Sequence, residues 1–444
     1  MMATERTKGG AGRMGHHVFI SAGEASGEHY GALLIQSLKR QFAARGQTAA
    51  FFGMGGDRMA EEGLERLVRS EDVAVMGITE VVRHLPRIYR EFRKLKQAAR
   101  SRRPDVAILI DFPDIHFKLA REFHRLGIPV IFFVSPQLWA WKKRRIRLVQ
   151  RYVTRMLVIF PFEQSYYRER SVAAEFVGHP LADLPLPSIS RMEFAAENGL
   201  DPDATWIGLL PGSRPREIQY NLPEMIRAAV LLCHTVHLEQ GHPEPQFIVP
   251  LAPTLTALER LAIEKMVGAL GQNLTIRLVN DLAAQGATVS SAGGARATLL
   301  HARASVVASG TATVEAALIG NPFVVVYRLS PLSYAIAKRV VTVPHVAMAN
   351  LIAGSRVVPE LIQNDFTALK IVQHIAPLLP DGAPRESMKR ELSRVGSLLR
   401  SRHRGREMGA IDRVATITIE LLDTAGPALG ESTRKSPLRA SQSE

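Results

Sequence analysis

Short apolar runs of strand length alternate with segments of helical spacing along almost the whole chain. In the first half these runs lie near residues 17–22, 49–53, 106–111, 130–135, 156–160 and 175–178. In the second half they lie near residues 206–210, 246–249, 275–279, 306–308 and 323–327. Strands that are apolar throughout and separated by helices are typical of parallel sheets covered on both faces. The alternation therefore predicts an α/β protein with mostly parallel sheets.

A proline-rich stretch separates the two series of strands. The segment HPLADLPLPSISR runs from His179 to Arg191 and is typical of a linker. We therefore expect two Rossmann-like, doubly wound domains that face a cleft, followed by C-terminal helices. The expected boundaries are 1–15 for a disordered tail, 16–190 and 191–366 for the two domains, 367–424 for the helices and 425–444 for a second disordered tail. Ligands of such sheets bind beyond the carboxyl ends of the strands, so the loops that follow the strands should carry the function.

The composition limits the class of protein. With 46% hydrophobic and 22% charged residues the chain can bury a core, which excludes a largely disordered or fibrous protein. Cys233 is the single cysteine, which excludes an intramolecular disulfide framework and a cysteine-based zinc site. No apolar run approaches the ~20 residues of a membrane-spanning helix, and the N-terminal residues have no apolar stretch of signal-peptide length. We expect a cytoplasmic protein that is soluble or bound to one face of a membrane.

The net charge of +14 is concentrated in two segments. Residues 83–103 hold nine Lys and Arg against Glu91 alone, and residues 142–155 hold seven with no acid. The rest of the chain is therefore close to neutral. Two basic segments indicate a polyanion, an anionic membrane or a phosphorylated substrate as partner. For either segment alone, a solvated helix face is an equally good interpretation.

The loop LLPGSRPREI, at residues 209–218, has the residues of a phosphate site. An apolar run leads into Gly212 and Ser213, followed by Arg214 and a helical pattern. Glycine lets a ligand approach the backbone, a helix N-terminus offers free N–H groups, and arginine can bind a phosphate with two nitrogens. The alternative is an ordinary strand-to-helix turn with a serine cap.

A second loop of the same kind, ASGTATVEAAL, occupies residues 308–318. The N-terminus of this helix can bind a pyrophosphate, and an acidic side chain one turn later can accept hydrogen bonds from ribose hydroxyls. Helix capping is again the alternative. Neither loop is a P-loop, because no Gly-Lys-Ser/Thr follows. The candidate nucleotide-binding residues of this second loop are Ser309, Gly310, Thr311 and Glu315.

Acidic residues follow two of the expected strands in the first half. The loop SAGEASGEHYG carries Glu24, and AILIDFPDIHF places Asp111 at the end of an apolar strand with Asp114 close behind. A carboxylate in such a position can take the proton from an attacking hydroxyl group. Asp111 is the first candidate for this base, Glu24 and Asp114 are the alternatives, and one of the two aspartates is expected to cap the next helix. We expect His116 to be structural.

The segment VMGITEVVRHLPRIYREFRKLK, at residues 75–96, has apolar residues at helical spacing and basic residues elsewhere. Pro86 predicts a broken or kinked pair of helices. Such a segment can lie on anionic lipid or cover an apolar substrate, although a plain amphipathic helix on a domain core has the same pattern. The candidate residues for acyl-chain or membrane contact are Ile78, Val81, Val82, Leu85, Arg83 and Arg87.

Two tryptophans precede the second basic segment. VSPQLWAWKKRRI places Trp139 and Trp141 next to four consecutive basic residues. Aromatic and basic residues together can bind nucleic acid or a membrane interface. A pair of core tryptophans beside a solvated basic helix is the alternative.

Ten motifs occur in an order that resembles the bacterial lipid-A-disaccharide synthases. They are SAGEASGEHYG, VMGITEVV, IDFPD, VSPQLWAWK, PFE, GHPLAD, LLPGSR, SGTATVEAAL, YRLSP and ANLIAG. The resemblance implies a two-domain inverting glycosyltransferase of the GT-B type that needs no metal or other cofactor. It implies transfer from UDP-2,3-diacylglucosamine to 2,3-diacylglucosamine 1-phosphate (lipid X), which forms a β-1′,6 disaccharide and UDP. Departures from the usual family residues occur at Glu28, His116 and Pro215.

The resemblance also implies roles for individual residues. Asp111 becomes the essential carboxylate, Arg214 contacts the UDP phosphates, and the loop with Ser309 and Glu315 surrounds the nucleotide, with Asn350 in the same cleft. The amphipathic segment would admit acyl chains, and both basic segments would hold the enzyme on the anionic inner face of the inner membrane.

The sequence is also compatible with a homodimer. Another GT-B enzyme of UDP-sugars, either a glycosyltransferase or an epimerase, is the alternative. Nucleic-acid binding explains the charge but not the two nucleotide loops, so we expect no nucleic-acid partner.

Overall fold

The computed structural model describes residues 15–73, 78–141, 143–237, 244–280, 294–330, 334, 343–403 and 405–424, without the side chains of residues 25, 78–85, 236 and 237. Most of the tail expected at 1–15 and all of the tail expected at 425–444 lie outside these residues. The described chain divides into two compact units. One comprises residues 15–133, 152–155 and 411–424, and the other comprises residues 134–151 and 156–410.

The first sheet has seven strands in the order β3-β2-β1-β4-β5-β6-β7. The pairings β3–β2, β2–β1, β1–β4, β4–β5 and β6–β7 are parallel. Six of the strands confirm apolar runs of the sequence, whereas β3 was not anticipated. The strands are β1 (Gly15–Ala22), β2 (Thr48–Gly55), β3 (Leu64–Arg69), β4 (Val106–Ile110), β5 (Val130–Phe133), β6 (Arg155–Val158) and β7 (Ala174–Phe176).

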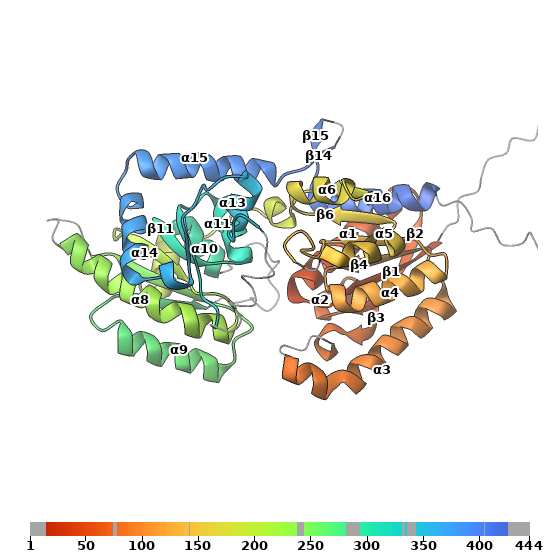
Figure 1. The fold of residues 1–444 in the computed structure, drawn as a ribbon, viewed down its shortest axis with the longest axis horizontal. Coiled ribbons are helices and arrows are strands. Elements are labelled where there is room, and N and C mark those ends of the chain that lie inside the picture. Colours follow the sequence, from red (N-terminus) through yellow and green to blue (C-terminus); the bar gives the residue numbers. More distant parts are fainter. Residues whose placement is uncertain are drawn as a thin grey trace, which may run out of the picture. The chain divides into compact units, whose positions relative to one another are not determined.

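Helices connect these strands (Figure 1). They are α1 (Ala25–Ala43), α2 (Asp57–Glu61), α3 (Ile78–Arg102), α4 (Pro113–Arg125), α5 (Ile146–Tyr152) and α6 (Pro161–Arg168). The last helix of the described residues, α16 (Ala410–Thr424), is held to α1 because Asp412 accepts hydrogen bonds from Ser37 (2.5 Å) and Arg40 (2.8 Å). Residues 411–424 thus belong to the same unit as the described residues up to 133.

Pro86 does not divide α3 into two helices. A single helix runs from Ile78 to Arg102 with Pro86 inside it, so the expectation of a broken helix is wrong, whereas a kink at Pro86 stays a prediction. Proline removes one backbone donor, but sixteen residues follow it within the helix and keep their own hydrogen-bonding groups. The buried side chains of Leu95 and Ala99 hold this longer part against the rest of the unit.

The second sheet has six strands in the order β10-β9-β8-β11-β12-β13, and all of its pairings are parallel. The strands are β8 (Trp206–Leu210), β9 (Gln246–Leu251), β10 (Ile276–Asn280), β11 (Ala304–Ala308), β12 (Phe323–Tyr327) and β13 (Glu360–Ile362). Its helices are α7 (Arg191–Asn198), α8 (Pro215–His237), α9 (Ala257–Leu270), α10 (Gly294–His301), α11 (Thr311–Ile319), α13 (Met348–Ala353), α14 (Ala368–Ile375) and α15 (Ala383–Leu398).

Several short elements complete the described chain. Two-residue strands β14 (Arg402–His403) and β15 (Arg406–Glu407) pair antiparallel. The short 3₁₀ helices are Ser70–Asp72, Lys143–Arg145, Pro180–Asp183, Gln363–Asp365 and Ala376–Leu378. Two parallel sheets surrounded by helices, with helices at the C-terminal end, confirm the expected α/β fold class.

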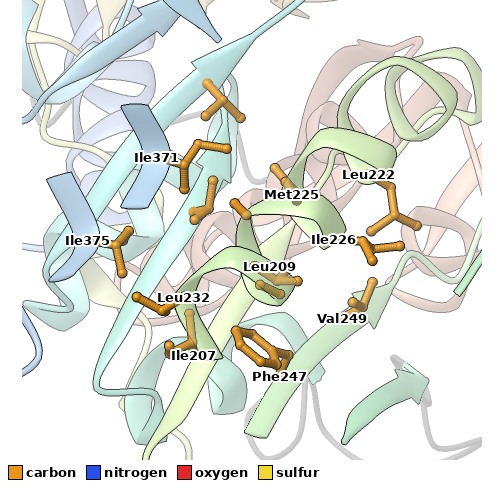
Figure 2. Packing of buried hydrophobic residues seen from close by; sticks show 14 of the residues in the cluster. Ile207, Leu209, Leu222, Met225, Ile226, Leu232, Phe247, Val249, Ile371 and Ile375 are labelled. Atoms are coloured by element: carbon orange, nitrogen blue, oxygen red, sulfur yellow. The ribbon is translucent and has the colours of Figure 1, made fainter. Parts of the chain in front are cut away.

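The core of the second unit lies between its sheet and two helices (Figure 2). Helix α8 presents Leu222, Met225 and Ile226 at the three- and four-residue spacing of one helix face, and α14 adds Ile371 and Ile375. Each of these buried side chains stabilises the fold by about 1.5–3 kcal/mol. Because α8 is fixed on the sheet in this way, the loop between β8 and α8 has a defined position.

Within the described residues, no helix is both long enough and apolar enough to cross a bilayer.

Candidate active site

Asp111 lies where β4 ends, in an unusual backbone conformation. Its φ is +50° and that of Phe112 is +51°, which is the left-handed region. This region costs an L-residue other than glycine about 1–2 kcal/mol, although aspartate tolerates it better than most. The Asp111 N–H donates to the carbonyl of Phe133 at the end of β5 (2.9 Å). Strain of this kind persists where the surrounding structure enforces it, and it often marks a functional position.

The environment of the Asp111 carboxyl changes its acidity. Burial and the neighbouring negative charge of Glu24 raise its pKa from 3.8 to about 6, against the opposing effect of the Phe112 N–H, which hydrogen-bonds to the carboxyl. A carboxylate with a pKa near neutrality binds a proton more readily than an ordinary aspartate. Asp111 therefore has the acid–base property that a general base requires.

The other two candidate carboxylates have different surroundings. Glu24 is the exposed N-cap residue of α1, and Asp114 is exposed in the first turn of α4. The expectation that one of the two aspartates caps α4 is wrong, because its N-cap residue is Phe112 and no side chain makes a cap hydrogen bond there. An acid in the first turn is still favourable to the helix. Among the three carboxylates predicted from the sequence, the structure half-buries only Asp111, and it brings Glu24 within electrostatic range of that residue.

Phe112 is fixed between two neighbours. A Cβ added to Gly23 would lie 2.4 Å from its ring, so glycine is required for the loop after β1 to pass this side chain. The ring also meets the imidazole of His116 edge-on, with centroids 5.7 Å apart. His116 itself is fully buried, which agrees with the structural role expected for it. The residue after Asp111 thus holds the two strand-end loops together.

The loop between β8 and α8 contains an anion of its own. One carboxylate oxygen of Glu217 accepts hydrogen bonds from the N–H groups of Ser213 (3.2 Å) and Arg214 (3.4 Å). The other oxygen accepts from the Arg214 guanidinium (3.4 Å). Gly212 has a φ of +117°, and an added Cβ would meet Glu217 at 2.5 Å. The N–H groups expected to receive a phosphate are therefore arranged to bind an anion, and a carboxylate occupies them.

Two further residues of this region were not predicted from the sequence. Asn221, fully buried on α8, donates to the carbonyl of Pro211 (2.9 Å) and so fixes the start of the loop. Tyr327, at the end of β12, has a pKa raised mainly by burial. The negative charge of Glu217 raises this pKa further, and the positive charge of Arg214 lowers it. No local pattern identifies either residue, because each acts through a contact made across the fold.

The loop between β11 and α11 leaves room for a ligand. Gly310 is the N-cap residue with a φ of +153°, and a Cβ added there would meet no described atom within 4 Å. Gly310 and Thr311 are exposed, whereas Ser309 and Glu315 are partly buried. No side chain caps this helix. Its first turn therefore matches the expected nucleotide loop in form.

Asn350 makes hydrogen bonds within the protein. The fully buried amide donates to the carbonyl of Val358 (2.9 Å) and to Glu360 (2.8 Å), and its oxygen accepts from the N–H groups of Val357 (2.8 Å) and Val358 (2.9 Å). Glu360 also accepts from the N–H of Ala347 (2.9 Å). Direct contact of Asn350 with a nucleotide stays a prediction, and this geometry favours a supporting role for the residue.

The candidate membrane residues are only partly described. The side chains of Ile78, Val81, Val82, Arg83 and Leu85 are outside the described part of the chain. Arg87 is half exposed and pairs with Asp72 on the preceding 3₁₀ helix.

The two tryptophans differ from each other. Trp139 donates to the buried carboxylate of Glu163 (2.9 Å) and packs on Phe162, whereas Trp141 is 42% exposed. One of the pair is therefore structural, and the other is available at the surface beside the second basic segment.

Comparison with known proteins identifies the family. Residues 18–411 match the family model described as lipid-A-disaccharide synthetase. A lipid-A-disaccharide synthase of Acidobacterium capsulatum is 58% identical over 407 residues, which cover 91% of this chain and 96% of that protein. The corresponding protein of Koribacter versatilis is 48% identical, with coverage of 86% and 93%.

Solved structures support the fold. A S. aureus MnaA–UDP structure has a TM-score of 0.59 at 13% identity, covering 92% of this chain and 97% of that chain. CalG4, the calicheamicin glycosyltransferase, has a TM-score of 0.54 at 17% identity, with coverage of 94% and 100%. At these identities the likeness concerns the fold alone. The family match and the close relatives extend over nearly the whole chain, so this chain belongs to the lipid-A-disaccharide synthase family.

Proposed function

We propose that this chain is an inverting glycosyltransferase that joins UDP-2,3-diacylglucosamine to lipid X, forming lipid A disaccharide 1-phosphate and UDP. The observation that carries the proposal is the carboxyl of Asp111, half-buried at the end of β4 with its pKa raised to about 6, in a chain that matches the synthase family along most of its length. Relatives that are 58% and 48% identical bear the synthase name, which favours this reaction over that of another UDP-sugar enzyme.

Asp111 would act as the general base. The 6-hydroxyl of lipid X attacks the anomeric carbon of the donor sugar from the face opposite UDP, and Asp111 takes the hydroxyl proton as the new C–O bond forms. The bond from the anomeric carbon to the pyrophosphate oxygen breaks, and its electron pair leaves with UDP. A base of this kind typically accelerates a reaction about 10²- to 10⁴-fold.

The loops after β8 and β11 would bind the departing nucleotide. Arg214 and the backbone N–H groups of its loop offer positive charge to the pyrophosphate, while the open turn at Gly310 lets it approach α11. Fixed donors that stabilise developing charge are worth about 3–4 kcal/mol each when they act in the transition state. Glu315, one turn into α11, is the proposed partner of the ribose hydroxyls.

We also propose that the enzyme works at the anionic inner face of the inner membrane. Trp141 (42% exposed) and Leu148 (36% exposed) flank exposed Lys143, Arg144 and Arg147, so apolar and basic groups occur together. Helix α3 adds exposed Tyr89 among its arginines. Apolar side chains that enter the interface and basic side chains that meet lipid head groups bind a membrane together.

A homodimer remains a separate prediction, which light scattering of the purified protein would test.

The decisive experiment is a UDP-release assay on detergent-dispersed substrates with EDTA present. We expect release to require both the diacylated donor and lipid X, and to persist when metal is chelated. Release from the donor alone, or conversion of the UDP-sugar without an acceptor, would instead indicate a hydrolase or an epimerase. Loss of release with EDTA would contradict the metal-free mechanism while leaving the reaction itself in place.

A further inference from the structure

A fully buried histidine connects the end of β1 to the backbone of the candidate base. One ring nitrogen of His116, Nε2, lies 2.8 Å from the hydroxyl of Ser21 at the end of β1. The other, Nδ1, lies 2.6 Å from the backbone carbonyl of Asp111. Both His116 and Ser21 are completely excluded from solvent.

The hydrogen-bond partners determine which nitrogen carries the proton. A backbone carbonyl can only accept, so Nδ1 must be the donor to Asp111. Burial lowers the pKa of His116 to about 4, so the ring is neutral near pH 7, and its Nε2 is then an acceptor that receives the Ser21 hydroxyl proton. The carbonyl of Asp111 thus fixes the tautomer, and the Ser21 hydroxyl, which can donate or accept, donates to Nε2 and holds the ring in place.

The backbone of Asp111 is held on both sides. Its N–H donates to Phe133 on β5, and its carbonyl accepts from His116 on α4. Between these two bonds lies the left-handed φ of +50° that directs the carboxyl. Without the imidazole, the carbonyl would lose its donor in a buried place, and the strained backbone would be free to relax to an ordinary conformation.

We propose that His116 is a positioning residue for the reaction, which with Ser21 holds the backbone of Asp111 in the left-handed conformation that places its carboxyl against the acceptor hydroxyl. His116 itself moves no proton, because it is excluded from solvent and both of its nitrogens are bound within the protein. The inference rests on the proposed function, and it adds a two-residue support that the proposed mechanism does not contain.

The test compares substitutions of His116 with a packing substitution on the same helix. His116→Ala removes both hydrogen bonds. His116→Asn keeps one donor and one acceptor on a shorter side chain, and Ser21→Ala removes only the hydroxyl that donates to Nε2. Phe123→Leu is the matched control: Phe123 is also fully buried on α4, where it packs on Phe19 (ring centroids 4.8 Å apart).

We expect His116→Ala to lower kcat about 10- to 100-fold while KM for both substrates stays within about twofold, because a misplaced base slows chemistry rather than binding. His116→Asn should recover much of this loss, and Ser21→Ala should lower kcat less than His116→Ala does. Phe123→Leu should lower Tm and leave kcat unchanged. Equal effects of His116→Ala and Phe123→Leu on kcat, or an effect on KM alone, would overturn the proposal.

A crystal structure of His116→Ala provides a readout that does not depend on turnover. We expect Asp111 to leave the left-handed region in this variant and to keep it in His116→Asn. An unchanged φ in His116→Ala contradicts the positioning role even where activity is low. Failure of the wild-type enzyme to release UDP would contradict the proposed function instead, and the backbone of Asp111 would still decide the present inference.

Discussion

At the scale of single residues, the carboxylate charge that we propose for catalysis by Asp111 has an energetic cost to the fold. Its pKa of about 6 lies above the ordinary 3.8, so the folded state holds the proton more tightly than the unfolded state does. The stability of the protein therefore falls as pH rises from about 4 to 6, because the folded state must then carry a poorly solvated charge. A residue that lowers stability in its active form is typical of a catalytic site.

Asp111→Asn should separate these two properties. Asparagine has the same shape and tolerates the left-handed backbone, but it has no charge. We expect kcat to fall about 10²- to 10⁴-fold. The free energy of unfolding should rise by about 1–2 kcal/mol at pH 8, after allowance for partial solvation, and hardly at all at pH 4. Thermal unfolding at the two pH values and UDP release measure both effects.

The exposed neighbour on the same loop provides the control for this substitution. Asp114→Asn should leave kcat near the wild-type value, since Asp114 lies at the surface of the first turn of α4. Near-normal turnover in Asp111→Asn, or a greater loss in Asp114→Asn, would transfer the role of base to another carboxylate.

Glu24 should set the pH dependence of the reaction. Its negative charge contributes to the raised pKa of Asp111, so wild-type kcat should decline as pH falls through about 6. Glu24→Gln removes the repulsion, and the decline should then occur at a lower pH. A pH–rate profile of both proteins measures the shift. A decline at the same pH in Glu24→Gln would contradict the electrostatic effect of Glu24, and inactivity of this variant at every pH would indicate that Glu24 itself is the base.

At the scale of elements, the β8–α8 loop shows how a helix start can hold an anion before a ligand arrives. Glu217 binds the N–H groups of Ser213 and Arg214, which a pyrophosphate would also need. Glu217→Gln weakens this internal competitor and removes a charge that repels phosphate. We expect the Kd of UDP to fall about 3- to 10-fold in isothermal titration, a change of about 1 kcal/mol.

Glu386→Gln serves as the comparison for Glu217→Gln. It removes one negative charge from an exposed position on α15 and should leave the Kd of UDP unchanged. Weaker UDP binding in Glu217→Gln would mean that the carboxylate is needed to orient Arg214, and it would disprove competition.

The loop after β5 depends on one buried acid of α6. Glu163 accepts hydrogen bonds from the Ser135 hydroxyl (2.6 Å), the Trp139 indole (2.9 Å) and the Phe160 N–H (3.2 Å). In Glu163→Gln an amide NH₂ replaces one of the accepting oxygens, so at least one buried donor loses its partner. We expect a loss of about 1–3 kcal/mol in urea unfolding. Glu169→Gln, exposed at the end of the same helix, should change the unfolding free energy by less than about 0.5 kcal/mol.

Prediction of elements from the sequence succeeded where burial was uniform and failed where it was not. Strands β8 and β12 have the bounds of their apolar runs, because both lie inside the sheet and are apolar throughout. Strand β3, with the sequence LERLVR, was missed because it lies at the edge of its sheet and exposes part of its length. Strand β13 has three residues and was too short to recognise.

At the scale of the whole molecule, local sequence patterns offered candidate site residues but not the contacts that hold them in place. The position of Asp111 at the end of β4 was predictable because a carboxylate after an apolar strand is a local pattern, and its role as base stays a prediction. The hydrogen bonds of His116 and Glu217 could not be predicted from the sequence, because they depend on the three-dimensional positions of their partners. The same holds for α16: no local pattern states that a helix starting at Ala410 packs on α1 near Ser37. Long-range placement is decided by packing, which periodicity does not encode.

The uneven charge of the whole chain leads to a test of membrane binding. The full-length protein should bind vesicles of anionic phospholipid and be released by salt, because exposed basic groups are screened at high ionic strength. We expect combined Lys143→Gln, Arg144→Gln and Arg147→Gln to weaken binding by roughly 100-fold, at about 1 kcal/mol per charge near the surface. Vesicle co-sedimentation over a range of salt concentrations measures the change.

A matched variant on α15 controls for net charge. Lys389→Gln, Arg390→Gln and Arg394→Gln remove the same three charges from an exposed helix without neighbouring tryptophan. Both triple variants should release UDP normally from detergent-dispersed substrates, whereas only the first should lose vesicle binding. Equal losses in the two variants would mean that total charge alone attracts the protein to lipid. In that case the exposed Trp141 and Leu148 would have no special part in docking, and Trp141→Ala should leave vesicle binding unchanged.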